Sequence, residues 1–173
     1  MHAGRQPTTG LTIKICGARL LIEATSEGVT ALRFLGGHPH RPPNVHSLLD
    51  LASQPLTPLL AQLIRELDEY FAGRRETFSV PLSLARVSSP FQRRVLQACA
   101  RIPYGHTRTY AELARIVAGT PSAARAVGRA LAVNPLPILI PCHRVIHTDG
   151  SLGGFGWGLE WKEFLLRLEG AIP

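Results

Sequence analysis

Cys142 and His143 put a thiol next to an imidazole, directly after residues 134–141, a run that holds three prolines. A thiolate is a strong nucleophile, and a histidine can take the proton that the thiol must lose. The prolines exclude a regular helix and favour extended backbone in the residues before them. Such a restrained chain can hold a nucleophile at a fixed point of a pocket wall. The pair therefore predicts chemistry on sulfur, whereas a lone cysteine more often belongs to a packed core.

The other cysteines do not extend this reactive set. With Cys142, the residues Cys16 and Cys99 make an odd number of thiols, too widely spaced for the paired pattern of a zinc site. Cys16 and Cys99 lie in apolar runs and are predicted to be reduced packing residues. Three histidines of a glycine- and proline-rich stretch lack acidic or thiol companions: His38, His40 and His46. We predict no metal and no cofactor.

Positive charge is concentrated in one part of the 173-residue chain. Residues 86–147 hold nine arginines and a single acidic residue, Glu112, whereas the rest of the chain has ten basic and eleven acidic residues. The net charge of +7 therefore arises in that stretch. A basic stretch that contains a reactive cysteine predicts contact with nucleic-acid phosphates. The alternative is a solvated basic face without a partner.

Composition predicts a globular protein, with 45% apolar and 18% charged residues. No apolar run approaches the roughly 20 residues that cross a bilayer, and residues 1–10 lack the hydrophobic stretch of a signal peptide. We expect a cytoplasmic protein associated with the nucleoid, or a nuclear one if the organism is a eukaryote, without membrane contact. We also expect a monomer, and the sequence leaves cooperative assembly on DNA open.

The order of predicted elements indicates an α+β (α/β) chain with a domain boundary near Ala85, giving domains 1–85 and 86–173. The first domain starts with three short β-prone runs between glycine-containing turns, at residues 11–16, 20–25 and 29–35. After a loop at residues 36–47, Thr57 and Pro58 begin an amphipathic helix that ends near Gly73. Residues 77–84 are predicted to be a strand or an extended linker.

The second domain contains a predicted helix-turn-helix. Ser89 and Gln92 form a capping-box pattern for a helix that reaches about residue 101. Thr109 and Glu112 form a second capping box, for a helix that ends at Gly119. A third helix, residues 122–133, follows after so short a turn that the pair predicts a helix-turn-helix. A glycine-rich loop, residues 148–158, precedes a last helix at residues 159–168.

The third helix of this domain is thin, because most of its side chains are small. Arg125 and Arg129 stand among alanines and Gly128, so the backbone can approach another surface closely. That surface is either a neighbouring helix or DNA. Asn and Gln, which read bases, are absent from it, so the helix predicts binding without sequence choice.

The run from Asn134 to Val145 resembles the active-site signature of the alkylguanine-DNA alkyltransferases, and the resemblance extends over residues 88–170. It implies that Cys142 accepts an alkyl group irreversibly from 6-O-alkylguanine, with 4-O-alkylthymine as a second candidate substrate. It also implies a relay in which Glu169 orients His143, which acts on the thiol through a water. Asn134 is similar to the family's hinge residue.

The same resemblance implies how duplex DNA with alkylated guanine is bound. A winged helix-turn-helix enters the minor groove, Arg125 fills the gap left by the extruded nucleotide, and Tyr110 crowds the 3′ phosphate. Extrusion is needed because a stacked base cannot bring its 6-oxygen to a pocket thiol. The implied DNA-contacting residues of the thin helix also include four more: Ala124, Ala126, Gly128 and Arg129.

The implied base pocket is lined by five residues: Tyr110, Val145, Phe155, Gly156 and Trp157. Trp157 replaces a small residue of some relatives, which bears on the tolerance for bulky alkyl groups. The first domain is similar to the family's ribonuclease H-like domain in size and element order.

Three other functions fit part of the pattern. A helix-turn-helix regulator explains the charge but gives Cys142 no purpose. A non-catalytic protein that binds alkylated DNA needs no cysteine acceptor. A Cys-His hydrolase needs an oxyanion site and has no use for a basic helix-turn-helix.

Overall fold

The computed structural model describes residues 8–39 and 57–173. Contacts divide the chain into two compact units, residues 1–86 and 87–173, which are described separately. Part of the predicted loop at residues 36–47, with His40 and His46, lies outside the described residues. Among the residues that are described, no helix combines the length and the apolarity needed to cross a membrane.

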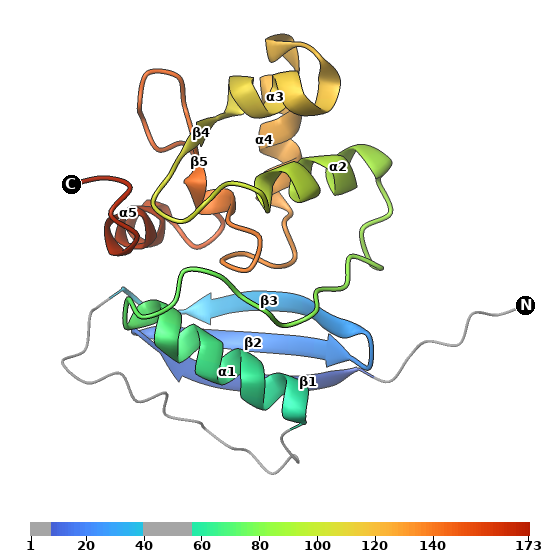
Figure 1. The fold of residues 1–173 in the computed structure, drawn as a ribbon, viewed down its shortest axis with the longest axis vertical. Helices are drawn as coiled ribbons and strands as arrows, with labels where there is room; N and C mark the ends of the chain where they lie inside the picture. Colours follow the sequence, from blue (N-terminus) through green and yellow to red (C-terminus); the bar gives the residue numbers. More distant parts are fainter. Residues whose placement is uncertain (1–7, 40–56) are drawn as a thin grey trace, which may run out of the picture. The chain divides into compact units, whose positions relative to one another are not determined.

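The first unit is an antiparallel three-stranded meander with one helix packed on it (Figure 1). Its elements in chain order are β1 (Thr9–Ile15), β2 (Ala18–Thr25), β3 (Gly28–Gly36) and α1 (Pro58–Phe71). Cys16 and Gly17 form the two-residue turn between β1 and β2, both with positive φ, as tight hairpins require. The apolar stripe of α1, which includes Leu60, Leu63 and Leu67, is buried. Thr57 caps the helix and Pro58 is its first residue, as predicted.

One predicted strand of this unit is absent from the described structure. Residues 77–84 run extended beside β3 but form only a single parallel bridge, between Val29 and Leu82. Val29 N donates to Pro81 O at 2.9 Å and Ser83 N donates to Val29 O at 2.9 Å. The stretch is therefore the extended linker of the two predicted alternatives.

The second unit surrounds the cysteine run with short helices. Its elements in chain order are α2 (Pro90–Cys99), β4 (Arg108–Thr109), α3 (Tyr110–Ala118), η1 (Pro121–Ala123), α4 (Ala124–Ala132), η2 (Cys142–Arg144), β5 (Val145–Ile146) and α5 (Leu159–Leu168). The helix-turn-helix is α3 and α4, joined by Gly119 at φ 69° and a 3-10 turn. The predicted third helix is thus shorter, because Pro121 begins a 3-10 turn rather than an α-helix.

The two capping boxes have different outcomes. Thr109 and Glu112 cap each other's backbone at the start of α3, as predicted. Ser89 caps α2, but the amide of Gln92 does not return to it. Instead Gln92 Nε2 donates to Val133 O at 3.1 Å and Ala130 O at 3.4 Å, so it binds carbonyls left open at the end of α4. Gln92 therefore joins α2 to α4.

Two residue pairs form a parallel sheet that the pattern did not predict. Arg108 pairs with Val145, and Thr109 pairs with Ile146 (Figure 1). This pairing fixes the start of α3, and hence Tyr110, beside the residues that follow the cysteine. Two residues are too short for an alternation of polar and apolar side chains to show.

Candidate active site

The run before the cysteine is a compact loop held by one amide side chain. Asn134 Oδ1 accepts from Leu136 N at 3.0 Å, while its Nδ2 donates to Ile140 O at 2.9 Å. Ile140 N donates to Leu136 O at 2.7 Å, which closes a turn around Ile138. Ile138 has φ 71°, a conformation that costs a β-branched residue on the order of 1–3 kcal/mol. The loop is therefore stable only where its surroundings hold it.

Cys142 leaves this loop as the first residue of η2 and is 8% exposed. Its sulfur accepts a hydrogen bond from Asn134 Nδ2 at 3.2 Å. Burial raises the pKa of the Cys142 thiol, whereas the Asn134 amide and the charge of Lys162 favour the thiolate and lower it in part. The Asn134 amide therefore both braces the loop and supports negative charge on sulfur.

His143 is fully buried and pairs with the carboxylate predicted for it. Its Nε2 lies 2.8 Å from Glu169 Oε1, across 26 residues of sequence. Burial lowers the pKa of His143, and Glu169 opposes that shift in part. With Glu169 ionised, Nε2 is the protonated nitrogen and Nδ1 is the basic one. Nδ1 is buried and has no hydrogen-bond partner among the described residues, so its lone pair is available.

Arg144 was not predicted to take part, yet it completes the carboxylate's surroundings. Its Nε donates to Glu169 Oε2 at 2.8 Å and its Nη2 donates to Glu169 Oε1 at 2.9 Å. A third bond runs from Nη1 to Ile102 O at 2.6 Å. Burial by itself raises the pKa of Glu169, but the bonds from His143 and Arg144 outweigh it and bring the pKa to about 2. The carboxylate is therefore anionic at every physiological pH.

Lys162 is the second residue that the prediction missed. It is one of two lysines in the chain and is fully buried, with Nζ donating to Val145 O at 2.6 Å and to Leu152 O. Burial lowers its pKa to about 8, although the two thiols at Cys142 and Cys99 favour the charged form. Lys162 stands seven residues before Glu169 on the same stripe of α5, and this helical spacing was the available signal.

Replacing this lysine by methionine is expected to destabilise the protein by about 2 kcal/mol, because two buried carbonyls lose their donor. The glycine-rich loop is also expected to loosen, since Leu152 belongs to it. Chemical denaturation measures the loss, and Lys14→Met, which changes the exposed second lysine, is the control. Equal stability of the two variants would show that the hydrogen bonds of the buried amine do not stabilise the fold.

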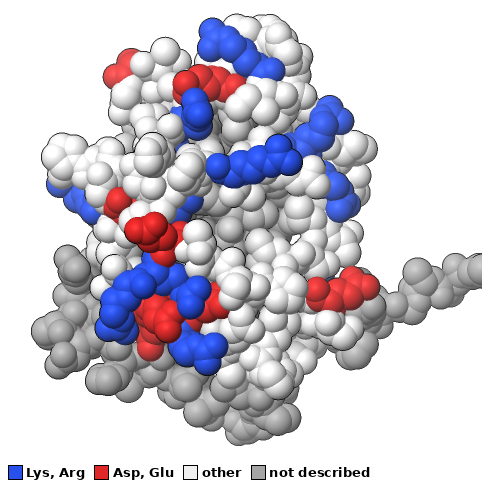
Figure 2. Space-filling model, viewed as in Figure 1, with Lys and Arg blue, Asp and Glu red and all other residues white. Residues whose placement is uncertain are grey.

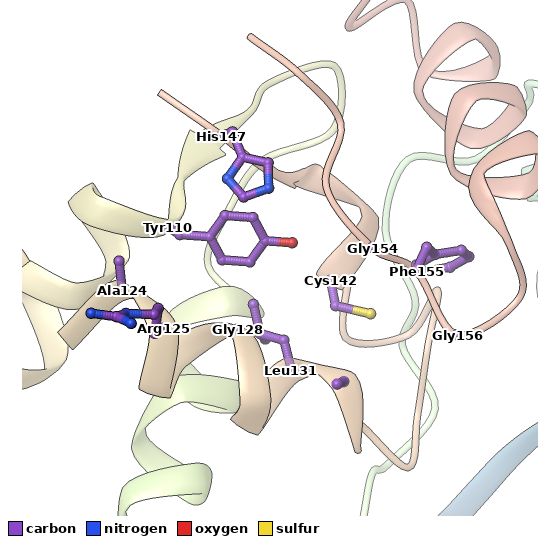
Figure 3. Close-up of a pocket in the computed structure, with 11 residues that line it drawn as sticks. Tyr110, Ala124, Arg125, Gly128, Leu131, Cys142, His147, Gly154, Phe155 and Gly156 are labelled. Atoms are coloured by element: carbon purple, nitrogen blue, oxygen red, sulfur yellow. The ribbon is translucent and has the colours of Figure 1, made fainter. Parts of the chain in front are cut away.

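A cavity of about 560 Å³ opens beside the sulfur, within the range of about 300–1,000 Å³ typical of small-molecule sites. Figure 3 shows α4 on one side of it, Tyr110 and His147 on another, and the glycine-rich loop opposite. The lining residues are Tyr110, Ala124, Arg125, Gly128, Leu131, Ala132, Cys142, His147, Gly154, Phe155 and Gly156. The thiol is therefore not sealed, because its sulfur belongs to a cavity wall.

Several residues assigned to the base pocket or to DNA contact are not among those that line this cavity. Val145 is fully buried in β5, and Trp157 packs edge-on against Trp161 with ring centroids 5.6 Å apart. Neither lines the cavity, since both face the core of the unit. Ala126 and Arg129 lie on α4 but do not line it either. The helix turns about 100° per residue, so only one stripe of α4 faces the cavity.

Exposed arginines surround this site. Those of the second unit before the cysteine are Arg94, Arg101, Arg108, Arg115, Arg125 and Arg129. Figure 2 shows basic side chains at several points over α2 and α3, with acidic side chains between some of them. Such a spread is suited to separate phosphates along a backbone. In the described part of the chain no group of three or more His, Cys, Asp or Glu side chains is placed to hold a metal ion.

Two family models match the chain, one for each unit. Residues 90–171 match the model described as 6-O-methylguanine DNA methyltransferase, DNA binding domain. Residues 17–84 match the model described as 6-O-methylguanine DNA methyltransferase, ribonuclease-like domain. Together the matches cover both compact units.

Named relatives and solved structures agree with these matches. The constitutive methylated-DNA–protein-cysteine methyltransferase of Bacillus subtilis is 53% identical over 114 residues, which is 65% of this chain and 67% of the relative. Its namesake from Methanosarcina acetivorans is 50% identical over 107 residues, 62% of this chain and 67% of the relative. The crystal structure of Mycobacterium tuberculosis O6-methylguanine methyltransferase superposes with a TM-score of 0.75 at 34% identity, covering 95% of this chain and 93% of that one. A structure of the Mycobacterium tuberculosis protein in complex with DNA also has a TM-score of 0.75, at 37% identity over 92% of each chain.

Proposed function

The chain belongs to the 6-O-methylguanine-DNA methyltransferase family, and on this premise we propose that it repairs DNA by moving the alkyl group of 6-O-alkylguanine onto Cys142. One observation carries the proposal: the cysteine sulfur lines a cavity, and behind it stands a buried imidazole–carboxylate pair whose Nδ1 is without a partner in the described residues. The protein is consumed in the reaction, since the methyl thioether formed on Cys142 would need a further nucleophile to take the methyl group and release the thiolate, and the reaction supplies none.

The chemistry balances between the thiol and the modified base. The thiol proton passes to His143 Nδ1, through a bridging water because no hydrogen bond joins the two side chains. The thiolate attacks the methyl carbon, so that a C–S bond forms while the bond from that carbon to the 6-oxygen breaks. The electron pair of the broken bond stays on guanine, which takes up a proton at N1. Glu169 stabilises the imidazolium that exists in between.

The charge of the site directs the proton. Burial disfavours a lone thiolate, but Asn134 donates to the sulfur and Lys162 supplies a positive field. Arg144 keeps Glu169 ionised, so the carboxylate stays an acceptor for His143 and does not compete for the thiol proton.

Duplex DNA must present the base outside the stack. Arg125 and Gly128 belong to the α4 stripe that lines the cavity, and Tyr110 stands at its mouth. These positions support insertion of α4 into the minor groove, with Arg125 taking the place of the extruded nucleotide. In this proposal residues 86–173 bind DNA and accept the alkyl group, and residues 1–85 are structural. The work on DNA would keep the protein at the nucleoid of a bacterial or archaeal cell.

Intact-protein and peptide mass spectrometry after mixing with methylated duplex tests the proposal. We expect one methyl group per protein molecule, on Cys142, with no further uptake when DNA is in excess. Absence of an adduct on this residue, under conditions where duplex is bound, would reject the assignment.

Arg125→Ala is expected to slow repair of a methylated duplex by about tenfold or more and to leave the reaction with free 6-O-methylguanine within about twofold. Unstacking a base costs a few kcal/mol, of which the arginine offsets a part only when there is a duplex to fill. Rates of adduct formation on the two substrates measure the effect, and Arg115→Ala, on α3 and outside the cavity, is the control. Equal losses on both substrates would assign Arg125 to the pocket rather than to extrusion.

A further inference from the structure

His147 lines the cavity without a place in the relay described above. It is exposed at the mouth, just after β5, and begins a tight turn that the chain closes on itself. His147 N donates to Ser151 O at 2.8 Å, and Gly150 N donates to His147 O at 3.0 Å. Inside the turn, Asp149 Oδ1 accepts from Ser151 N at 2.9 Å and from Ser151 Oγ at 2.6 Å. The turn therefore holds the backbone of His147 in one place.

The imidazole is directed by its contact with Tyr110. The two ring centroids are 5.1 Å apart, and Figure 3 shows the rings next to each other at the cavity rim. A methyl group on Gly153 would come within 2.9 Å of His147 Nε2 and 3.0 Å of the Tyr110 hydroxyl. Both polar atoms therefore lie close to Gly153, and any side chain at that position would collide with them.

Charged groups near this imidazole come from each neighbouring element. Asp149 on its own turn is exposed and acts on it electrostatically, and hydrogen bonds from Ser151 lower the pKa of Asp149, so the aspartate is anionic near neutral pH. Arg125 on α4 lines the same cavity. Lys162 on α5 has its Nζ 5.7 Å from the centroid of the Tyr110 ring, which His147 contacts on its own side. No described residue forms a hydrogen bond with the ring nitrogens of His147.

We infer that His147 is a phosphate-binding residue for the extruded nucleotide. The inference rests on the proposed function, because it needs a base seated against Cys142. A nucleotide that enters base-first leaves its sugar and phosphate outside the base-binding part of the cavity, whose lining includes two basic side chains, His147 and Arg125. An imidazolium donates from both nitrogens, and an N–H to phosphate bond is of the strong, charge-assisted kind.

Histidine side chains in general change charge between about pH 5 and 8, and only the charged form adds a cation for a phosphate to pair with. The Cys142→Ala protein can bind a methylated duplex without reacting with it. Its binding affinity therefore reports the contact between His147 and phosphate apart from methyl transfer. Affinity is measured against salt concentration at pH 6 and at pH 8, because each phosphate neutralised contributes about 0.9 to the slope of log K against log salt. We expect the slope to be steeper by about 0.9 at pH 6 than at pH 8.

Two substitutions in that background decide the matter. His147→Asn is expected to give the shallower slope at both pH values, and His147→Arg the steeper slope at both. His106→Asn, on an exposed histidine of the same unit outside the cavity, is the control and should keep the pH difference.

The possible failures point to different errors. If at pH 6 the salt-dependence slope of the His147→Asn protein equalled that of the Cys142→Ala protein from which it is made, the phosphate contact would be overturned. A protein without an adduct on Cys142 would refute the proposed function itself, whatever the slopes show.

Discussion

Protein carrying Cys142→Ala is expected to take up no methyl group while binding duplex DNA within about twofold of the wild-type affinity, a difference of about 0.4 kcal/mol. The sulfur is the acceptor in the proposed reaction, yet it contributes only one residue of a cavity wall that α4, Tyr110 and the glycine-rich loop also form. Adduct formation is followed by mass spectrometry and binding by a salt-controlled titration.

Cys99→Ala is the matched control for this substitution. Cys99 is also buried, and burial raises the pKa of its thiol well above the ordinary value, so it is not a thiolate near neutral pH. The Cys99 variant should still be methylated on Cys142 with unit stoichiometry. An adduct elsewhere in the Cys142 variant, or loss of its DNA binding, would contradict the assignment of a purely chemical role.

Glu169→Gln is expected to slow methyl transfer by about 100-fold on both duplex and free base, and to destabilise the protein by about 3 kcal/mol. General acid–base assistance contributes about 10²–10⁴-fold, and breaking a buried ion pair leaves the partner charge without compensation. Here that partner is Arg144, which would lose the opposite charge of the carboxylate and keep its hydrogen bond to Ile102 O. Rates below the unfolding transition and denaturant titration measure the two effects.

An exposed pair on the same helix provides the control. Glu163 accepts from Arg167 at 2.9 Å in an i,i+4 pair, and surface pairs of this kind contribute about 0–1 kcal/mol. Glu163→Gln should therefore leave rate and stability almost unchanged. If the Glu169 variant behaved the same way, the carboxylate would have no part in the relay.

The stability of the protein at acid pH should also depend on the Glu169 carboxylate. The folded pKa of Glu169 is about 2, below its ordinary 4.5, so the folded state binds fewer protons than the unfolded state in that interval. Its stabilisation is complete above about pH 4.5 and is lost as the pH falls towards 2. Between these values the wild type should lose its stability advantage over Glu169→Gln.

Much of the second unit was predictable, because its signals are local. Pro90 and Ser89 begin α2, Thr109 and Glu112 cap α3, and Gly119 ends it, each through a backbone requirement that the residue type meets. The proximity of Glu169 to His143 was inferred from the motif, and the two atoms are 2.8 Å apart. The proposed reactive pair, Cys142 and His143, was likewise chosen from adjacent residues of the sequence.

The remaining parts depend on contacts between distant segments. The pairing of β4 with β5 rests on two residues each, so no pattern could display it. Val145 and Trp157 were assigned to the base pocket by resemblance, and their burial in the unit, with Trp157 against Trp161, depends on packing that no local pattern displays. Lys162 and Arg144 carry charges that ordinarily lie on the surface, and their burial is intelligible only once the carbonyls and the carboxylate that receive them are in place.

The backbone of Ile138 has a consequence for the order in which the protein takes shape. An isolated peptide spanning residues 134–145 would scarcely sample a left-handed isoleucine, since nothing in it compensates the steric cost. In the whole protein that side chain is 1% exposed, so the surrounding core holds it. The peptide's cysteine would then react like any thiol in solution, and during refolding alkyl-acceptor competence should appear only after the helices around the loop have docked.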